Sequence, residues 1–175
     1  SVLRRCVSEY RGAAVYASID QSQDAVAFSR LKNVSSLARR GPLTPDHVIR
    51  TKRTPVIIGS DIERSVELFS NQYKTYFDKY SSEGVTMLDP APRWAVWPGY
   101  GVVCFGASLK ETQIISDITR QTVAAICQAE SGLGGWKPLA ASRLYEIEYW
   151  DLEQAKLRSA VSKKAPHQGK VAIVS

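Results

Sequence analysis

Four side chains between residues 47 and 53 have the charges needed to bind an anion: His47, Arg50, Lys52 and Arg53. A histidine and three cations could hold a sugar phosphate or a carboxylate through charge-assisted hydrogen bonds. The same segment could instead form a basic strand edge that deters aggregation or contacts a neighbouring domain. The two interpretations differ in whether these side chains converge in a closed pocket or point along an exposed edge.

A second group of residues could carry out acid–base chemistry: Tyr145, Glu146, Glu148 and Tyr149. The two glutamates are two residues apart on a predicted helix, so they do not share a face. We therefore expect solvated or interfacial roles for both of them.

Residues that could bind a metal are few. The histidines are His47 and His167, and the cysteines, Cys6, Cys104 and Cys127, have neither a CxxC pair nor metal-ligand spacing. The sequence therefore predicts no catalytic metal in this chain. It also predicts inert, reduced thiols, which fits a cytoplasmic protein.

The composition is that of a soluble globular domain. With 175 residues, of which 44% are hydrophobic and 23% charged, the chain can bury a sizeable core. Its net charge of +6 is concentrated within residues 30–53 and at Lys163 and Lys164, without a nucleic-acid-binding motif. No apolar run approaches the roughly 20 residues of a membrane span. We expect neither nucleic acid nor membrane as a partner.

Helices of about 20 residues separate the predicted strands, which indicates an α/β sandwich whose mixed sheet is flanked by helices. Strands are expected over residues 15–19, 47–51, 56–58, 94–97 and 102–105. Helices are expected near residues 2–7, 24–31, 34–40 and 109–129, and from 139 to as far as 157. One more helix of about five turns, capped by Ser60 and Glu63 and ended by Gly84, places on one face Ile62, Val66, Phe69, Tyr73, Phe77 and Tyr80.

A glycine-flanked corner, Pro98-Gly99-Tyr100-Gly101, joins the last two strands, and a helix capped by Ser108 and Glu111 follows. This order resembles the class II aldolase/adducin family, and the resemblance implies a partial class II aldolase fold. That family has a zinc-binding histidine at the corner, where this chain has Tyr100. A neutral phenol is a poor zinc ligand. Tyr100 is thus either a core or interface aromatic or part of a vestigial substrate pocket.

The tail, Gly169-Lys-Val-Ala-Ile-Val-Ser175, resembles the first strand of a short-chain dehydrogenase, without the glycine-rich turn that would cradle a dinucleotide. Together with residues 44–55, these features resemble the middle of bifunctional proteins that fuse a class II aldolase to a short-chain dehydrogenase. Such proteins are often described as rhamnulose-phosphate aldolase/lactaldehyde dehydrogenases. The resemblance implies an aldolase-like domain over residues 1–158, a linker over 159–168 and the start of a truncated dehydrogenase domain over 169–175.

The function implied by this resemblance is that of a non-catalytic connecting domain in a carbohydrate-metabolising oxidoreductase. Its expected partners are the upstream aldolase and downstream dehydrogenase domains of the same protein, within a homo-oligomer. We expect no cofactor in this chain, whereas NAD(P) and zinc are possible in the parent protein. The alternative is a sugar-phosphate-binding or lyase domain that uses the basic segment 47–53, with Tyr100 as a further substrate contact.

Overall fold

The computed structural model describes residues 2–132 and 134–151. Its centre is a four-stranded sheet in the order β1-β4-β3-β2, where β1 is Tyr16–Asp20, β2 is Val56–Ile57, β3 is Trp94–Trp97 and β4 is Gly101–Gly106. Strand β4 pairs antiparallel with both β1 and β3, and β2 runs parallel to β3. The predicted mixed sheet is confirmed.

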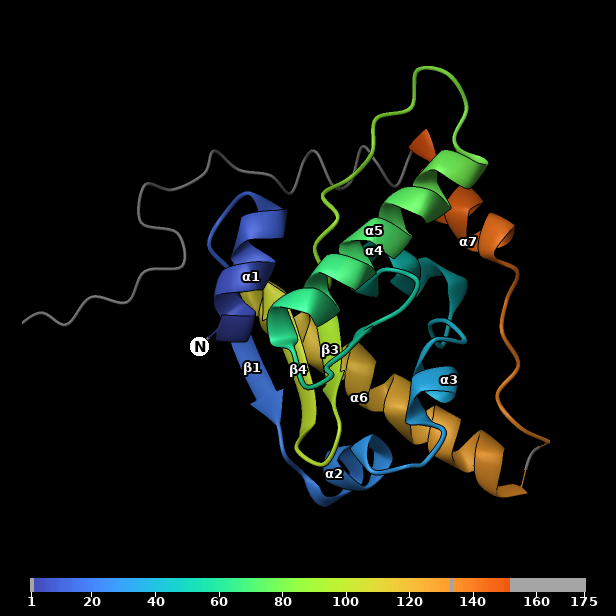
Figure 1. The fold of residues 1–175 in the computed structure, drawn as a ribbon. Coiled ribbons are helices and arrows are strands. Elements are labelled where there is room, and N and C mark those ends of the chain that lie inside the picture. Colours follow the sequence, from blue (N-terminus) through green and yellow to red (C-terminus); the bar gives the residue numbers. More distant parts are fainter. Residues whose placement is uncertain (1, 133, 152–175) are drawn as a thin grey trace, which may run out of the picture.

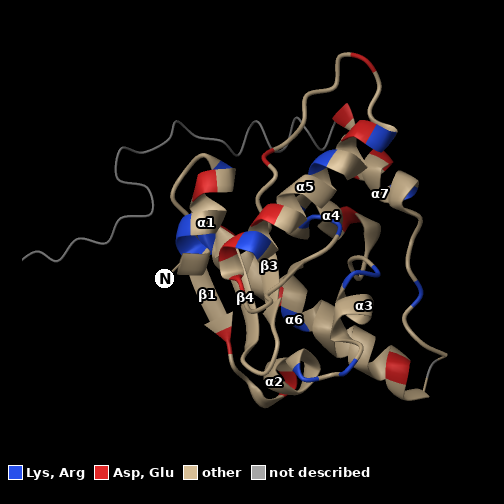
Figure 2. Ribbon diagram, viewed as in Figure 1, with Lys and Arg blue, Asp and Glu red and all other residues tan. Residues whose placement is uncertain are grey.

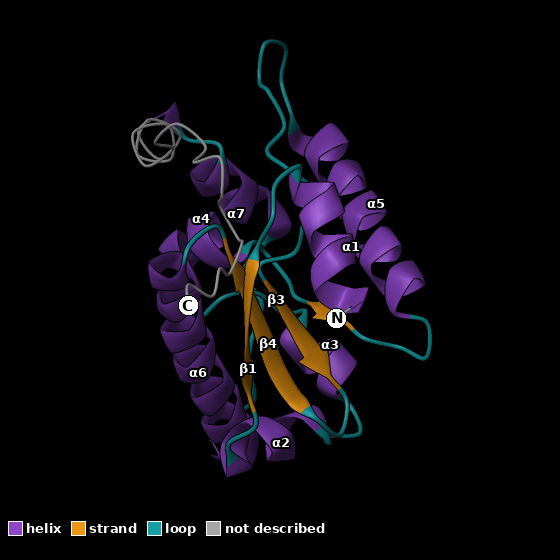
Figure 3. Ribbon diagram, turned by 90° about the vertical axis from the view of Figure 1, so that its left-hand side faces the viewer, coloured by secondary structure: helices purple, strands orange, loops and turns teal. Residues whose placement is uncertain are grey.

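Seven α-helices surround the sheet in the described part of the chain (Figure 1). They are α1 (Val2–Arg11), α2 (Gln23–Ser29), α3 (Val34–Ala38), α4 (Val48–Thr51), α5 (Ile62–Tyr80), α6 (Leu109–Gly132) and α7 (Ala141–Glu148). Viewed along the sheet, α1 and α5 cover one face and α6 covers the other (Figure 3). Helices α4 and α7 lie at one end of the sheet, and α2 lies at the other (Figures 1 and 3).

Alternation along the strands divides the interior into two cores. Ala95, Val103 and Phe105 face the core that contains α1, α5 and α7. Trp94, Val96, Val102 and Cys104 face the core that contains α2, α3 and α6. Both faces of the two central strands are therefore buried, which explains why their sequences are continuous apolar runs.

The hairpin between β3 and β4 has the turn that its sequence predicts. Pro98 fixes the first central position, Gly99 takes φ 82° at the second, and the Tyr100 N–H donates to the Trp97 carbonyl over 2.9 Å. Gly101 follows with φ 128°, and a Cβ there would lie 2.2 Å from the Asp20 carbonyl oxygen. The turn therefore needs glycine at both positions.

The predicted helices are present, with two corrections at their boundaries. Helix α5 is capped by Asp61, whose carboxylate accepts from the Arg64 N–H over 2.9 Å, and not by Ser60. The helix ends at Tyr80, four residues before Gly84. At α6, Ser108 caps as predicted, with its hydroxyl accepting from the Glu111 N–H over 3.1 Å.

The strand predicted over residues 47–51 is wrong. Residues Pro45–His47 form a 3-10 helix (η1), and Val48–Thr51 form α4. Pro45 pre-sets the first helical φ, and the Thr51 hydroxyl donates to the His47 carbonyl over 2.9 Å. These local contacts outweigh the strand preference of the β-branched residues.

Helix α7 ends at Glu148, with Tyr149 as its C-cap, so the predicted helix does not continue through Trp150. The predictions for residues 152–157, for the linker over 159–168 and for the strand over 169–175 lie outside the described residues. Among the described residues, no helix combines the length and hydrophobicity needed to cross a membrane. The basic residues between 30 and 53 follow the chain from α2 to α4, whereas α1 and α5 carry both charges (Figure 2).

Candidate functional site

The most unusual residue in the structure is Lys52, the C-cap of α4. Its backbone has φ 61° and ψ 173°, a region that is essentially restricted to glycine. It has the only positive φ of any non-glycine residue in the described part of the chain. Such strain costs of order 1–3 kcal/mol and persists only where surrounding contacts enforce it.

This backbone conformation accompanies a lysine side chain that is only 3% exposed. Its Nζ lies 3.8 Å from Glu148 Oε1 and 3.6 Å from the centroid of the Tyr73 ring. Glu148, from the last turn of α7, is 1% exposed. Lys52 and Glu148 therefore form a buried ion pair that joins α4 to α7 beside α5.

Tyrosine hydroxyls extend this pair into a directed chain. The Tyr73 hydroxyl donates to Glu148 Oε1 over 2.8 Å and lies 2.6 Å from the Tyr149 hydroxyl. Because Tyr73 has one proton to give, the Tyr149 hydroxyl must donate to Tyr73. The Leu88 N–H donates to the Tyr149 oxygen over 3.3 Å. The network runs from Leu88 through two tyrosines to the glutamate.

Burial shifts the ionisation of both charged partners. Loss of solvent, together with the nearby Arg93 charge, lowers the pKa of Lys52 from 10.5 to about 7, against the opposing effect of Glu148. Burial also raises the pKa of Glu148, although Lys52 and the Tyr73 hydroxyl counteract the shift. A lysine with such a pKa carries a sizeable fraction of neutral amine near pH 7, the form that acts as a base or a nucleophile.

A second buried pair lies close to the first. Arg93, directly before β3, donates to both carboxylate oxygens of Asp89 over 2.8 and 2.6 Å. Burial opposes ionisation of Asp89, but the Arg93 charge and hydrogen bonds hold the pKa of Asp89 below its ordinary value. Arg93 therefore pairs with Asp89, and Glu148 is the partner of Lys52.

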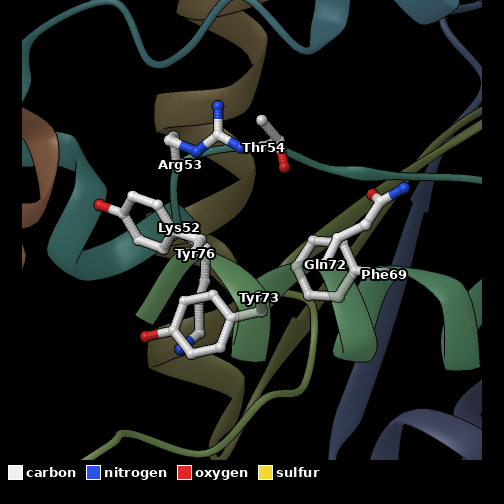
Figure 4. Close-up of a pocket in the computed structure, with 7 residues that line it drawn as sticks. All are labelled: Lys52, Arg53, Thr54, Phe69, Gln72, Tyr73 and Tyr76. Atoms are coloured by element: carbon white, nitrogen blue, oxygen red, sulfur yellow. The ribbon is translucent and has the colours of Figure 1, made fainter. Parts of the chain in front are cut away.

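Access to Lys52 is restricted. A narrow pocket beside it is lined by Lys52, Arg53, Thr54, Phe69, Gln72, Tyr73 and Tyr76. The Lys52 side chain runs towards the Tyr73 hydroxyl, whereas the Arg53 guanidinium extends the opposite way (Figure 4). The guanidinium carbon of Arg53 lies 5.1 Å from the centre of the Tyr76 ring. The Lys52 ammonium and the Arg53 guanidinium are therefore not directed towards the same ligand position.

The other predicted site residues are also dispersed. His47 ends η1 and Arg50 lies within α4; neither lines the pocket beside Lys52. Tyr100 is 59% exposed and packs against Trp97 in a tilted arrangement, with ring centroids 5.5 Å apart. It follows β3, whereas Arg93, the neighbour of Lys52, precedes that strand. Of the five residues named as possible substrate contacts, Lys52 and Arg53 line this pocket, whereas His47, Arg50 and Tyr100 do not.

The prediction that Glu148 is solvated or interfacial is wrong. Glu146 does face solvent, where it pairs with Arg143 over 2.9 Å. Because Glu146 and Glu148 are two residues apart on α7, they lie on different faces, and Glu148 faces inward. The missed signal is the inward stripe of Tyr145, Glu148 and Tyr149, at the i, i+3, i+4 spacing of one helix face.

The described residues also do not fit a zinc site of the kind that the fold family implies. Within residues 2–132 and 134–151, no three His, Cys, Asp or Glu side chains are grouped so that they could hold a metal ion. The corner residue, Tyr100, is 59% exposed, and its neutral phenol is a poor zinc ligand.

Comparison with known proteins places this geometry in a family. The sequence matches the family model described as aldolase class II, second domain, over residues 1–157. Among curated proteins, "Uncharacterized oxidoreductase YuxG" of Bacillus subtilis (strain 168) is 29% identical over 186 residues, which cover 99% of this chain and 26% of that protein. The chain therefore spans about a quarter of the length of this relative.

Two solved structures share the fold. YgbL from Escherichia coli, an aldolase/epimerase/decarboxylase candidate, superposes with a TM-score of 0.53 and 18% identity, covering 84% of this chain and 64% of that one. YgbL from Klebsiella pneumoniae gives a TM-score of 0.50 and 19% identity, covering 83% and 63%. With the family match extending over residues 1–157 and the mixed sheet and Pro98–Gly101 corner in place, the chain belongs to the class II aldolase second-domain family.

Proposed function

We propose that this chain is a non-catalytic, aldolase-like domain that connects and orients neighbouring domains of a longer oxidoreductase. One observation carries the proposal: Lys52, the cation at the centre of the basic segment, is used internally, 3.8 Å from Glu148 and 3% exposed. Its strained backbone and buried pair hold α4 against α7 and α5. The remaining cations of the segment do not converge on a cavity.

The comparison with YuxG supports the connecting role. That relative is named an oxidoreductase, and this chain corresponds to 26% of it. The redox chemistry then belongs to other parts of the longer protein, where we also place NAD(P), zinc and a sugar or hydroxy-aldehyde substrate. A domain of this kind contributes surfaces, and Leu109 and Trp150 are large apolar residues that are 70% and 54% exposed.

A competing function is supported by the ionisation of Lys52. An amine with a pKa of about 7 beside a glutamate and tyrosine hydroxyls has the chemistry of a lyase nucleophile or base. For this function, Lys52 would have to become accessible through the pocket that Arg53 borders. Arg53 would then be the residue that meets a substrate phosphate.

Two measurements separate these functions. Calorimetric titration of the chain with dihydroxyacetone phosphate at pH 7.5 should show no saturable heat. Micromolar binding that is lost in Arg53→Ala and kept in Arg143→Ala, which changes an exposed cation of α7, would favour the lyase. Hydroxyl-radical footprinting should show Leu109 and Trp150 protected in the full-length gene product relative to the isolated chain. Equal labelling in both would contradict the connecting role.

A further inference from the structure

A second cavity lies between α2, α6 and strands β1 and β4, separate from the pocket beside Lys52. It has a volume of about 170 Å³. An engineered apolar cavity of about 150 Å³ is known to take up benzene, so this cleft is large enough for a one-ring molecule. Ala25, Val102 and Val123 contribute apolar lining, and Cys104, Ser116 and Thr119 add polar groups.

Thr119 differs from the other buried threonines of its helix. The Thr112 and Thr122 hydroxyls donate to carbonyls four residues earlier, Ser108 and Ile118, over 2.8 and 2.9 Å. Thr119 is 2% exposed, and its Oγ1 makes no such bond to its own helix; its polar neighbour is the Cys104 thiol, a weak hydrogen-bonding group. A buried hydroxyl that lacks even this local bond costs of order 1–3 kcal/mol, so a ligand that pairs with it gains accordingly.

The Thr119 hydroxyl lies on the cleft side of α6. Burial raises the pKa of the Cys104 thiol to about 12, and a weak hydrogen bond with the Thr119 side chain opposes that rise. Cys104 lines the same cleft. The thiol stays protonated near neutral pH, so it is a passive wall of the cleft and not a nucleophile.

Charges at the rim restrict the kind of ligand. Asp20 accepts from the Arg120 side chain over 3.2 Å, which leaves that carboxylate neutralised. Asp24 also lines the cleft, is exposed, and has no ion pair among the described residues. Two carboxylates and one guanidinium give the rim a net negative charge, which repels phosphates and carboxylates and attracts an ammonium group.

We propose that the cleft between α2 and α6 binds a small neutral or cationic molecule with an apolar body of about one ring and a hydroxyl or amino group. The apolar body contacts Ala25, Val102 and Val123, and the polar group pairs with the Thr119 hydroxyl. The Asp24 carboxylate at the rim also attracts an ammonium group electrostatically. This site is independent of the buried Lys52–Glu148 pair and of the connecting role proposed above.

The test uses three probes of similar size and different charge: benzylamine, benzyl alcohol and benzoate. Each is titrated into the chain while amide and methyl resonances are followed by NMR. We expect saturable shifts at Ala25, Val102 and Val123 with benzylamine and benzyl alcohol, with dissociation constants of about 1 mM, as befits so few heavy atoms. Benzoate should bind at least about tenfold more weakly.

Three variants locate the binding. Ala124→Trp fills the cleft from its exposed rim and should abolish the shifts. Thr119→Val keeps the shape and removes the hydroxyl, and it should weaken benzyl alcohol about fivefold. Thr122→Val is the matched control, because its hydroxyl already bonds to Ile118, and it should leave binding unchanged.

Several outcomes would overturn the proposal. They are no saturable shift with any probe, shifts that persist in Ala124→Trp, and tighter binding of benzoate than of benzylamine. Equal weakening by Thr119→Val and Thr122→Val would also overturn it, because the effect would then come from the fold and not from the Thr119 hydroxyl. Thermal unfolding of each variant shows that it is folded before binding is compared.

Discussion

Lys52 and Glu148, far apart in the sequence, meet with 3.8 Å between Nζ and Oε1 inside the protein. Two ions removed from water lose solvation, and the attraction between them recovers that loss only where further hydrogen bonds complete the geometry. Here Tyr73 supplies one such bond to the glutamate and a ring face to the ammonium. The pair therefore fixes the relative positions of α4, α5 and α7 more than it adds net stability.

The first prediction is that removing one charge of this pair is more harmful than removing both. Glu148→Gln keeps an acceptor for Tyr73 but leaves Lys52 without a counter-charge, and it should cost about 3 kcal/mol of unfolding free energy. The double variant Lys52→Met/Glu148→Gln should recover part of that loss. Urea denaturation followed by circular dichroism measures both.

Glu146→Gln is the matched control on the same helix. Its partner Arg143 lies 2.9 Å away, and their side chains are 59% and 69% exposed. Exposed pairs contribute at most about 1 kcal/mol, so this variant should unfold almost as the parent does. If Glu148→Gln were as mild as Glu146→Gln, the buried pair would not hold the helices together.

The second prediction concerns pH. The pKa of Lys52 is lowered from 10.5 to about 7 in the folded chain, so above pH 7 the unfolded chain binds this proton and the folded chain does not. Stability that depends on Lys52 therefore rises with pH from about 7 towards 10, by at most one proton's slope of about 1.4 kcal/mol per pH unit. Burial raises the pKa of Tyr73, which reverses the trend above its unfolded value of 10.

The measurement is the free energy of unfolding between pH 6 and 9.5 for the parent and for Lys52→Met. The difference between the two curves should move in favour of the parent as pH increases. In Glu148→Gln the rise should begin at a lower pH, because Glu148 opposes the lowering of the Lys52 pKa. A constant difference across the range would show that Lys52 has an ordinary pKa.

The third prediction isolates the backbone strain at residue 52. Lys52→Ala and Lys52→Gly both remove the ion pair, but only glycine accepts φ 61° with ψ 173° at little cost. The glycine variant should therefore be more stable than the alanine variant by about 1–2 kcal/mol. The opposite order, which is normal for exposed helix positions, would mean that the backbone relaxes when the side chain is removed.

The same comparison at Arg50, within α4, provides the control. There the ordinary helix preference applies, so Arg50→Ala should be more stable than Arg50→Gly by about 1 kcal/mol. The two positions, two residues apart, should thus give opposite signs.

The sequence predicts the fold where a local pattern determines the structure. The helix α5 follows from the spacing of Val66, Phe69 and Tyr73, which are all buried. The β3–β4 hairpin follows from Pro98 and Gly99, whose backbone preferences define one turn. The helical form of residues 45–51 could have been predicted too, because Thr44, Pro45 and Asp46 are a typical helix start.

The site could not be predicted in the same way. Lysine is usually a surface residue, and Lys52 is buried with a partner only because of tertiary contacts with α5 and α7. The positive φ of Lys52 cannot be predicted from the local sequence, because lysine has no preference for that region. Segment 47–53 therefore looked like one cationic cluster, although Lys52 and Arg53 point in opposite directions (Figure 4).

The last prediction concerns the two glycines of the corner Pro98–Gly101. At Gly101, with φ 128°, an added Cβ would lie 2.2 Å from the Asp20 carbonyl oxygen, which is held in the pairing of β1 with β4. Gly101→Ala should therefore separate these strands locally and cost well over the roughly 1 kcal/mol of an ordinary conformational penalty.

Gly99→Ala tests the conformational penalty alone: its φ is 82°, and nothing lies within 4 Å of the new Cβ. Both variants should be compared by urea denaturation and by hydrogen exchange of the β1 and β4 amides. Gly101→Ala should lower the exchange protection of Val102 and Ile19, and Gly99→Ala should leave it near the parent's. Equal losses in both would show that backbone conformation, and not the contact with Asp20, accounts for glycine at this corner.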